Sequence, residues 1–485
     1  MCALEEHQGT HSANLVEGFL GPRRAGEPDF SRRARSGTGG GATTRRQRGS
    51  VVKAVSLFSN CGAGDVGFAA AGFRFRVVSE LVGKRLEVAK LNHPDAVAVS
   101  GDLRRTWPLV VDSFREAHGS EPPVLLSGCP PCQGMSSARG DRGKESDPDA
   151  GSRDGRNLLV LPIAEVAKEL RPMFIVVENV PAFLRRRVWD PYGAIPRSAA
   201  KILCDRLEAD YRIYAAVVDL CEFGIPQHRS RAFLTLVRKD TAALGVLRRT
   251  GRAPFPAPTH GGPDSPDFVT IDDALRESGL PALDAGSVET ARSDGQPMHQ
   301  VPVWLDRRYE MVSAIPPGSG ASAWETDHCG RCDMTGIDAA EAVCPRCHSP
   351  TLRPTVQNPD GSWRLVKGFR NSSYRRMDPA RPAATITTAS GHIGSDRTIH
   401  PWENRVLSPA ECAWLQTFPS AFQWGESMDN WGHTGVRQMI GEAVPPQFTT
   451  LHGGVLAALA EGHEVPASLS QRDERCTRAL AKLGT

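Results

Sequence analysis

The sequence predicts an α/β fold built on a doubly wound, parallel sheet. Three observations predict it: short apolar runs recur along residues 51–240, helical stretches separate several of them, and the first run ends in a Gly-rich turn. Strands that alternate with helices favour a parallel sheet, because the chain must cross back between parallel neighbours. A hydrophobic content of 40% is typical of a globular protein, and a net charge of only +3 excludes a histone-like basic protein.

The expected strands are short apolar runs that end at polar or turn-forming residues. They are Val51–Phe58, Arg76–Leu81, Ala96–Ser100, Val124–Ser127, Phe174–Val177, Ala215–Asp219 and Ala232–Val237. Helices are expected from the Gly-rich turn through Ala71, over Asn157–Leu170 and near Pro446–Ala460, with further regular structure over Pro409–Phe418. We expect the last helix to fold back beside residues 51–72.

The remaining segments lack this pattern. Residues 1–50 are rich in Gly, Ser and Arg, and predict a disordered basic tail that either binds DNA or is simply solvated. Residues 240–325 are rich in Pro and Gly, and the tail 461–485 shows no clear pattern. No apolar run is long enough to cross a bilayer and no signal peptide is evident, so we expect a cytoplasmic protein. Cysteines clustered in C-x-x-C pairs agree with a reducing compartment.

A nucleotide site is expected at the ends of the first three strands. The turn Gly62-Ala63-Gly64 follows a strand and opens a helix, so backbone amides can approach a ligand closely. Glu80 ends the second strand 18 residues after Gly62, where an acid typically binds ribose hydroxyls, and Asp102 follows the third strand. These residues indicate an adenosine-containing cofactor and leave NAD and S-adenosylmethionine open. The alternative for the turn alone is an ordinary tight connection.

A second group of residues carries reactive side chains. The loop from Gly128 to Gly134 contains two prolines that stiffen it and hold Cys132 at the mouth of the crevice. The alternative is redox or zinc chemistry through Cys129 and Cys132. Glu178 follows an apolar strand, where a carboxylate needs a partner and a structural ion pair is the competing interpretation.

Two arginines precede the last expected strand. Arg229 and Arg231 point to the same face if this segment is extended. A solvated basic edge is the alternative to a functional pair.

Four cysteines in the middle region predict a structural metal site. Cys329-x-x-Cys332 is followed, after eleven residues, by Cys344-x-x-Cys347, which is the spacing of two zinc knuckles. His328 and His348 flank the knuckles and are alternative ligands. Four protein ligands leave no position for a catalytic water, so the expected role of the zinc is folding. The competing interpretation is four unliganded surface cysteines. The neighbourhood is basic, which fits phosphate contacts or a solvated face.

Several motifs in fixed order resemble one family. The chain carries Phe58 to Gly64, Pro131-Cys132-Gln133, Glu178-Asn179-Val180, Gln227-x-Arg229-x-Arg231, Arg381-Pro382-Ala383-Ala384-Thr385-Ile386-Thr387, Leu407-Ser408-Pro409 through Leu415-Gln416-Thr417-Phe418-Pro419, and Gly441-Glu442-Ala443-Val444-Pro445. This series resembles the motifs of the DNA cytosine-5 methyltransferases over about residues 51–240 and 375–460. Two positions depart from the family pattern: Asn60 stands where Gly is common, and Glu442 stands where Asn is usual. Asn tolerates positive φ, so we expect the turn to survive.

The resemblance implies roles for individual residues. The expected catalytic residues are Cys132, Glu178, Arg229 and Arg231. The expected S-adenosylmethionine site comprises Phe58, Asn60, Cys61, Gly62, Gly64, Glu80, Asp102, Leu103, Pro130, Glu442, Ala443 and Val444. By resemblance, the thiolate of Cys132 adds to cytosine C6, Glu178 acts at N3 if its pKa is raised, Arg231 holds the base O2, and Arg229 supports the loop and the phosphate backbone.

The resemblance also implies an organisation and a partner. Residues 51–240 would form the catalytic domain, 241–375 the target-recognition region with a zinc insert at 326–350, and 376–460 the return to the catalytic domain. The expected partner is double-stranded DNA, held between two lobes, in a restriction–modification or other phage-defence system, together with a cognate defence component, or as a solitary methylase. Two alternatives remain: a transfer-RNA cytosine-5 methyltransferase of the same fold, and a non-catalytic DNA-binding protein.

Overall fold

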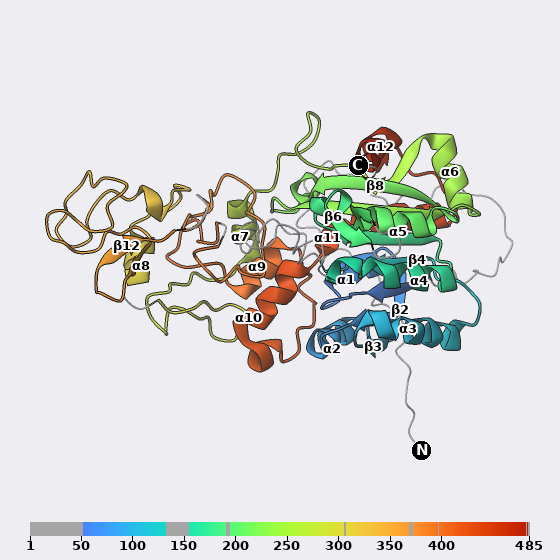
Figure 1. Ribbon diagram of the computed structural model, residues 1–485, viewed down its shortest axis with the longest axis horizontal. Helices are drawn as coiled ribbons and strands as arrows, with labels where there is room; N and C mark the ends of the chain where they lie inside the picture. Colours follow the sequence, from blue (N-terminus) through green and yellow to red (C-terminus); the bar gives the residue numbers. More distant parts are fainter. Residues whose placement is uncertain are drawn as a thin grey trace, which may run out of the picture.

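A seven-stranded sheet organises the larger part of the molecule (Figure 1). The computed structural model describes residues 52–131, 155–190, 195–304, 307–367, 372–395, 397–481 and 483. The expected tail over residues 1–50 and the expected nucleophile Cys132 lie outside the described residues. The strands are β1 (Val52–Leu57), β2 (Phe73–Glu80), β3 (Val97–Ser100), β4 (Leu125–Gly128), β5 (Phe174–Asn179), β8 (Tyr211–Asp219) and β9 (Ser230–Arg238). They lie in the order β3-β2-β1-β4-β5-β9-β8.

The sheet is mixed, whereas the sequence predicted a parallel one. Strands β1 to β5 pair in parallel, but β9 runs antiparallel to both β5 and β8. The link between β8 and β9 explains the difference. It holds only the short helix η4 (Leu220–Phe223) and a turn, and a parallel crossover needs a connection of about a dozen residues or more. The predicted α/β fold with helices on both faces is otherwise confirmed.

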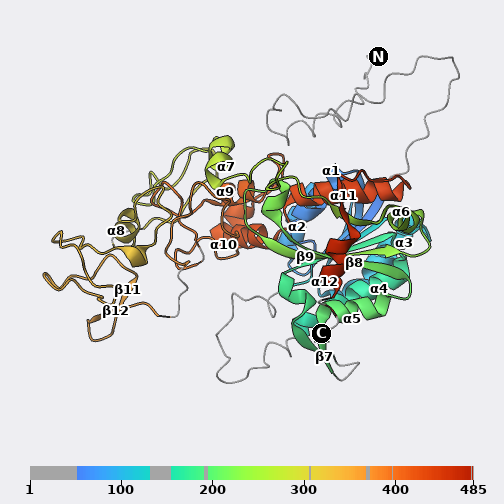
Figure 2. The ribbon, with the colours of Figure 1, turned by 90° about the horizontal axis from the view of Figure 1, so that it is seen from above.

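Helices cover both faces of the sheet (Figure 2). On one face α3 (Leu103–His118), α4 (Val160–Leu170) and α5 (Ala199–Leu207) pack on the sheet, with η2 (Gly155–Leu158) preceding α4. On the other face lie α1 (Ala63–Ala70), α2 (Gly83–Asn92), α6 (Ala242–Thr250) and α11 (Pro446–Ala460). Apolar side chains from both sides of the central strands are buried, which is why these strands read as continuous apolar runs in the sequence.

The helix α11 packs directly against α1, which confirms the expected return of the chain. A Cβ atom on Gly67 would lie 2.0 Å from Thr449 Oγ1, so only glycine allows this approach. The chain then continues into β13 (Ser470–Arg472), which pairs antiparallel with β10 (Arg252–Pro256), and into α12 (Asp473–Leu480), which packs near β8. No sequence pattern indicated β13 and α12, because both are short and polar.

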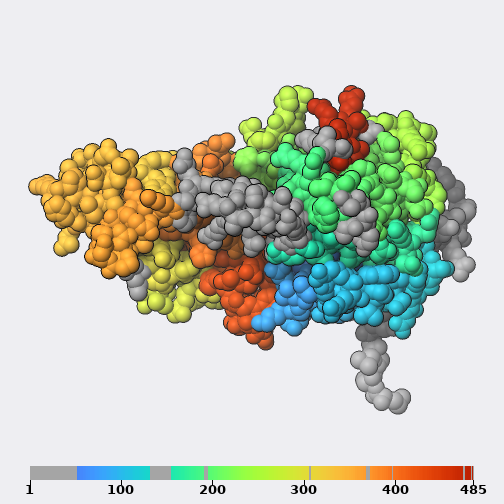
Figure 3. Space-filling view, in the orientation of Figure 1, coloured from blue at the N-terminus to red at the C-terminus, as the bar shows by residue number. Residues whose placement is uncertain are grey.

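The segment between β10 and α11 extends away from the sheet (Figure 1). Most of its regular elements are short: α7 (Ile271–Ser278), α8 (Arg307–Ser313), η5 (Ala323–Glu325), β11 (Thr355–Gln357), β12 (Trp363–Leu365) and α9 (Pro409–Leu415). The exception is the 16-residue α10 (Ser427–Glu442), which has a kink at Gly432. Figure 3 shows that residues around 326–365 occupy the narrow end of the molecule, far from the sheet. In the described part of the chain, no helix is both long and apolar enough to span a membrane.

Candidate functional site

The carboxyl ends of the parallel strands bring the predicted residues to one edge of the sheet. The Gly-rich turn follows β1, Glu80 ends β2 and Asp102 follows β3. Cys129 follows β4, and Glu178 is the penultimate residue of β5. Because parallel strands present their carboxyl ends at the same edge, residues far apart in the sequence meet there.

The Gly-rich turn adopts the strained backbone that a close ligand approach requires. Phe58, Asn60 and Gly62 have φ angles of 56°, 50° and 80°. The prediction that Asn60 tolerates positive φ is therefore confirmed. A Cβ atom on Gly62 would lie 3.1 Å from the His93 ring, and one on Gly64 would lie 3.3 Å from Val444 Cβ. The turn is thus held between α2 and the segment that precedes α11.

Glu80 is oriented by the same turn. Its Oε2 accepts a hydrogen bond from Asn60 N at 2.9 Å and its Oε1 accepts one from Val82 N at 3.1 Å. The Asn60 amide donates through Nδ2 to Met439 O at 2.8 Å, while its buried Oδ1 has no partner within the described residues. A fixed carboxylate and an unpaired acceptor fit a ligand that carries hydroxyl and ammonium donors, as S-adenosylmethionine does.

Other predicted cofactor residues surround this turn with different degrees of exposure. Cys61 is fully buried, and burial raises the pKa of its thiol to about 12, so the thiol is a packing group. Asp102 caps α3 by accepting from Arg104 N at 3.0 Å, and its side-chain hydrogen bond with the Arg104 guanidinium lowers the pKa of the Asp102 carboxyl. Leu103 and Ala443 are buried, and Pro130 is buried beside β5.

Glu442, which departs from the family pattern, has a charge partner. Arg85 Nη1 on α2 lies 2.6 Å from Glu442 Oε2. Arg85 was not among the residues predicted from the sequence. The one feature that could have indicated a basic partner was the carboxylate of Glu442 where Asn is usual. The ion pair joins α2 to the end of α10, next to the Gly-rich turn.

Glu178 lies at the centre of the second group of predicted residues. Its Oε1 is 2.9 Å from Arg231 Nε, and its Oε2 accepts a hydrogen bond from Cys129 Sγ at 2.9 Å. The Asn179 amide donates to Pro130 O at 2.9 Å. The carboxylate is buried and its two partners are partly buried, and the start of the loop that carries Cys132 is tied to β5. The contacts of Cys129 and Asn179 were not predicted from the sequence.

Arg229 has a structural position, and its expected phosphate contact is wrong. Its side chain is 2% exposed, and its guanidinium donates to Ile386 O at 2.9 Å, Gly441 O at 2.8 Å and Ala443 O at 3.1 Å. A guanidinium enclosed by backbone carbonyls cannot reach DNA. Arg231, the second residue of β9, has a different partner, because it contacts Glu178.

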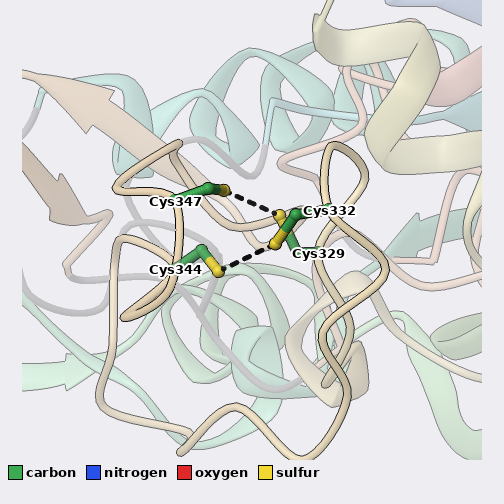
Figure 4. Close-up of side chains that lie close together, drawn as sticks. All are labelled: Cys329, Cys332, Cys344 and Cys347. Atoms are coloured by element: carbon green, nitrogen blue, oxygen red, sulfur yellow. Dashed lines mark hydrogen bonds between the residues drawn. The ribbon is translucent and has the colours of Figure 1, made fainter.

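The four predicted metal ligands converge in the segment between β10 and α11 (Figure 4). Cys329 Sγ and Cys347 Sγ are 3.5 Å apart, Cys332 Sγ and Cys344 Sγ are 3.6 Å apart, and all four sulfur atoms lie within 4.8 Å of one another. Tetrahedral zinc with bonds of about 2.3 Å needs sulfur atoms about 3.8 Å apart, so the arrangement fits a zinc site with four cysteine ligands. His328 and His348 do not belong to this cluster.

Arg353 attaches the cysteine-bearing loop to the chain that follows it, and Arg307 contacts that following chain. Arg353 is 3% exposed and donates to Ile337 O at 2.7 Å, within the cysteine-bearing loop. Arg307 on α8 donates to Thr355 Oγ1 at 2.5 Å and lies over the Trp363 ring at 4.8 Å. Both arginines line a cavity of about 700 Å³, together with Trp304, Arg308, Tyr374 and His392.

Comparisons with known proteins agree with this geometry. A family model described as C-5 cytosine-specific DNA methylase matches residues 52–452. Type II methyltransferase M1.HgaI of Avibacterium volantium is 28% identical over 406 residues, covering 81% of this chain and 95% of that protein. Type II methyltransferase M.AgeI of Thalassovita gelatinovora is 28% identical over 451 residues, covering 81% of this chain and 96% of that protein.

A solved structure shares the fold. The crystal structure of a DNA modification methyltransferase encoded within a prophage of E. coli covers 84% of this chain and 99% of its own, with 20% identity and a TM-score of 0.51. Because the family model spans most of the chain and the sheet has the expected architecture, this chain belongs to the C-5 cytosine-specific DNA methylases, which are DNA cytosine-5 methyltransferases.

Proposed function

We propose that Cys132 is the nucleophile of this methyltransferase and that Glu178 and Arg231 bind the target cytosine. The observation that carries the proposal is the buried Glu178 carboxylate, which lies between Arg231 and Cys129 at the cofactor edge of the sheet. Cys132 is only three residues beyond Cys129. A carboxylate and a guanidinium fixed side by side match the ring nitrogen and carbonyl of cytosine.

The chemistry of cytosine gives each group a task. The Cys132 thiolate forms a bond to C6, and the electrons of the C5–C6 double bond move toward C5. Glu178 donates a proton or strong hydrogen bond at N3 and so stabilises the charge that develops on the ring. Arg231 holds O2. Bound S-adenosylmethionine supplies the methyl group for C5. The C5 proton then leaves to a base, and the S–C6 bond breaks to release the thiolate.

The cofactor would be held by the residues around the Gly-rich turn. We propose contacts from Phe58, Asn60, Cys61, Gly62, Gly64, Glu80, Asp102, Leu103, Pro130, Glu442, Ala443 and Val444. Glu80 is the strongest member of this set, because two backbone amides already fix its carboxylate. Cys61 and Leu103 contribute through their backbone or through packing, since their side chains are buried.

The target nucleotide must leave the duplex before this chemistry can occur. Rotation out of the helix costs roughly a few kcal/mol of pairing and stacking. We assign the compensating contacts and the reading of sequence to residues 241–375, between the catalytic segments 51–240 and 376–460. Within this region, one structural zinc on Cys329, Cys332, Cys344 and Cys347 would hold the loops that line the cavity at Arg307 and Arg353.

The biological setting that we propose is a restriction–modification system in the cytoplasm. The relatives M1.HgaI and M.AgeI are named as type II methyltransferases and match nearly their full lengths. Methylation would then mark the host DNA against a cognate nuclease.

A trapping experiment tests the nucleophile. Bisulfite sequencing of a host genome that expresses the protein identifies the target sequence. A duplex with 5-fluorocytosine at that target should form a covalent adduct with the wild type, because fluorine blocks the loss of the C5 proton. Cys132→Ser should form no adduct and methylate nothing, while its affinity for DNA is retained. Cys204→Ala, which removes a buried thiol from α5, is the control and should still form the adduct.

Two results would contradict the proposal. Adduct formation by Cys132→Ser would exclude Cys132 as the nucleophile. Methylation of transfer RNA in place of duplex DNA would replace the DNA substrate with the RNA alternative.

A further inference from the structure

The hairpin that follows β5 has no role in the proposed chemistry. Beyond Glu178 the chain forms η3 (Pro181–Leu184) and then the antiparallel strands β6 (Arg187–Asp190) and β7 (Ile195–Ser198). The motifs that identify the family do not include these strands. The hairpin nevertheless starts only a few residues from the carboxylate that we assign to the target base.

The outer side of this hairpin is basic and aromatic. Arg185, Arg186 and Arg187 are consecutive and exposed. Within the part of the chain that the structure describes, neither Arg185 nor Arg186 forms an ion pair. Trp189 is 48% exposed, and it shares a strand face with Arg187 because alternate residues of a strand point the same way. The exposed tryptophan and the three arginines place an aromatic ring and positive charge next to each other on the surface.

The inner side of the hairpin fixes its position. Val188 and Asp190 are each 1% exposed. Arg197 on β7 forms an ion pair with Asp190 and another, at 2.5 Å, with Asp205 of α5. The acidic side chains of the hairpin and its support are therefore paired with Arg197. The charges of Arg185 and Arg186 remain directed outward from a rigid base.

The position of the hairpin suits a duplex whose target base lies at Glu178. Arg185 is seven positions after Glu178, so their Cα atoms are at most about 25 Å apart. That distance corresponds to roughly seven base pairs along a duplex. Figure 2 draws β7 on the same side of the molecule as β11 and β12 of the recognition region. A duplex between the two parts would have phosphates near the hairpin.

We propose that Arg185, Arg186, Arg187 and Trp189 form a second DNA-contact surface, on the catalytic part of the enzyme. The arginines bind phosphates of the duplex that flanks the target, and Trp189 packs against the sugar–phosphate backbone. The inference rests on DNA being the substrate. It assigns to the hairpin a sequence-independent contact, because a row of arginines on a fixed strand reads charge and not base edges.

The salt dependence of binding tests the surface without any need for catalysis. The probe is a duplex of mixed sequence and about three helical turns. Its dissociation constant is measured by fluorescence anisotropy between about 50 and 200 mM salt. The variant Arg185→Gln/Arg186→Gln should bind at least about tenfold more weakly at low salt, and the slope of log K against log salt should become shallower by about 1.8, since each lost phosphate contact removes about 0.9.

Three further variants make the test specific. Arg185→Lys/Arg186→Lys keeps the charges and should keep the slope. Trp189→Ala should weaken binding with an unchanged slope, because no charge is lost. Arg248→Gln/Arg249→Gln removes two exposed arginines from the end of α6 and should leave both affinity and slope close to wild type.

The outcomes separate this inference from the proposed function. Wild-type binding with an unchanged slope in Arg185→Gln/Arg186→Gln would refute the hairpin surface alone. An equal loss in the Arg248→Gln/Arg249→Gln control would also refute it, since the effect would then follow net charge. Failure of the wild type to bind any duplex would contradict both the surface and the DNA substrate.

Discussion

The sheet of this enzyme and the segment between β10 and α11 are stabilised by different interactions. In the sheet, strands such as β1 and β5 bury apolar side chains on both faces and satisfy their backbone groups within the ladder. The segment between β10 and α11 is mostly loops, and its apolar residues divide into several clusters, one of them around Trp304 and Ile315. Its backbone carbonyls need other donors, because buried polar groups without partners destabilise a fold.

Buried arginines and cysteines supply those missing interactions. Arg376 is fully buried and donates to Ile315 O at 2.9 Å and His400 O at 3.0 Å, and burial lowers the pKa of its guanidinium to about 10. Arg405 forms a buried ion pair with Glu411 at 2.6 Å. A sheet that is stabilised by apolar burial can therefore commit its charged residues to chemistry, whereas the segment between β10 and α11 uses such residues for folding.

Loss of the proposed zinc site should unfold part of the segment between β10 and α11 and leave the sheet intact. We expect Cys344→Ser to abolish stoichiometric zinc and to unfold residues 326–350, because structural zinc contributes on the order of 10 kcal/mol to such small modules. Metal analysis and hydrogen exchange measure the two effects. Full zinc content in Cys344→Ser would show that the ligand set is wrong.

The buried ion pair between Arg405 and Glu411 gives the segment between β10 and α11 a specific acid sensitivity. Burial alone would raise the pKa of Glu411, but the charge of Arg405 outweighs it and the pKa is lowered from 4.5 to about 2. The stabilisation is therefore complete above about pH 4.5 and is lost as the pH falls toward 2. Glu411→Gln should lower the free energy of unfolding by about 3 kcal/mol at neutral pH, because Arg405 loses a buried partner.

Denaturant unfolding at several pH values measures this difference. The difference in the free energy of unfolding between wild type and Glu411→Gln should shrink below about pH 4.5, since the variant has no carboxylate to protonate at this position. A difference in unfolding free energy that stays constant down to about pH 3 would mean that the carboxylate charge does not stabilise the fold.

Arg229 and Arg231 allow a role in folding to be distinguished from a role in catalysis. Arg229→Met should lower the free energy of unfolding by about 2–3 kcal/mol, because three buried carbonyls lose their donor. Arg231→Met should change unfolding less and should lower methylation by a factor of about 100, the usual range for one positioned charge. Parallel unfolding and single-turnover measurements would contradict this assignment if Arg229→Met affected only catalysis.

The smallest expected effect concerns the position where the family pattern usually has Asn. Glu442→Asn removes the ion pair with Arg85. Because the Glu442 side chain is 34% exposed, stability should change by less than about 1 kcal/mol. Calorimetric titration of the cofactor, with Arg85→Met as the matched variant, should show the same small change in affinity for both. Unequal changes would indicate that Glu442 contacts the cofactor independently of Arg85.

Local patterns in the sequence were sufficient to predict several parts of this protein. Apolar runs placed β1 to β5, regular structure was expected where α9 begins at Pro409, and the spacing of Cys329 to Cys347 predicted the cluster. These features follow from periodicity and short-range geometry, which depend on residues that are close together in the sequence. The family itself was also evident, because its motifs occur in a fixed order.

The partners of individual side chains, in contrast, emerged only when the whole chain was packed. Arg229 and Arg231 are two residues apart and chemically identical, yet one is enclosed by carbonyls of residues 386, 441 and 443 and the other contacts Glu178. Neither the antiparallel direction of β9 nor the pairing of Arg85 with Glu442 was predicted from the sequence. The hydrogen bond from Arg229 to Ile386 joins residues that are 157 positions apart, and no local pattern records a contact over such a separation.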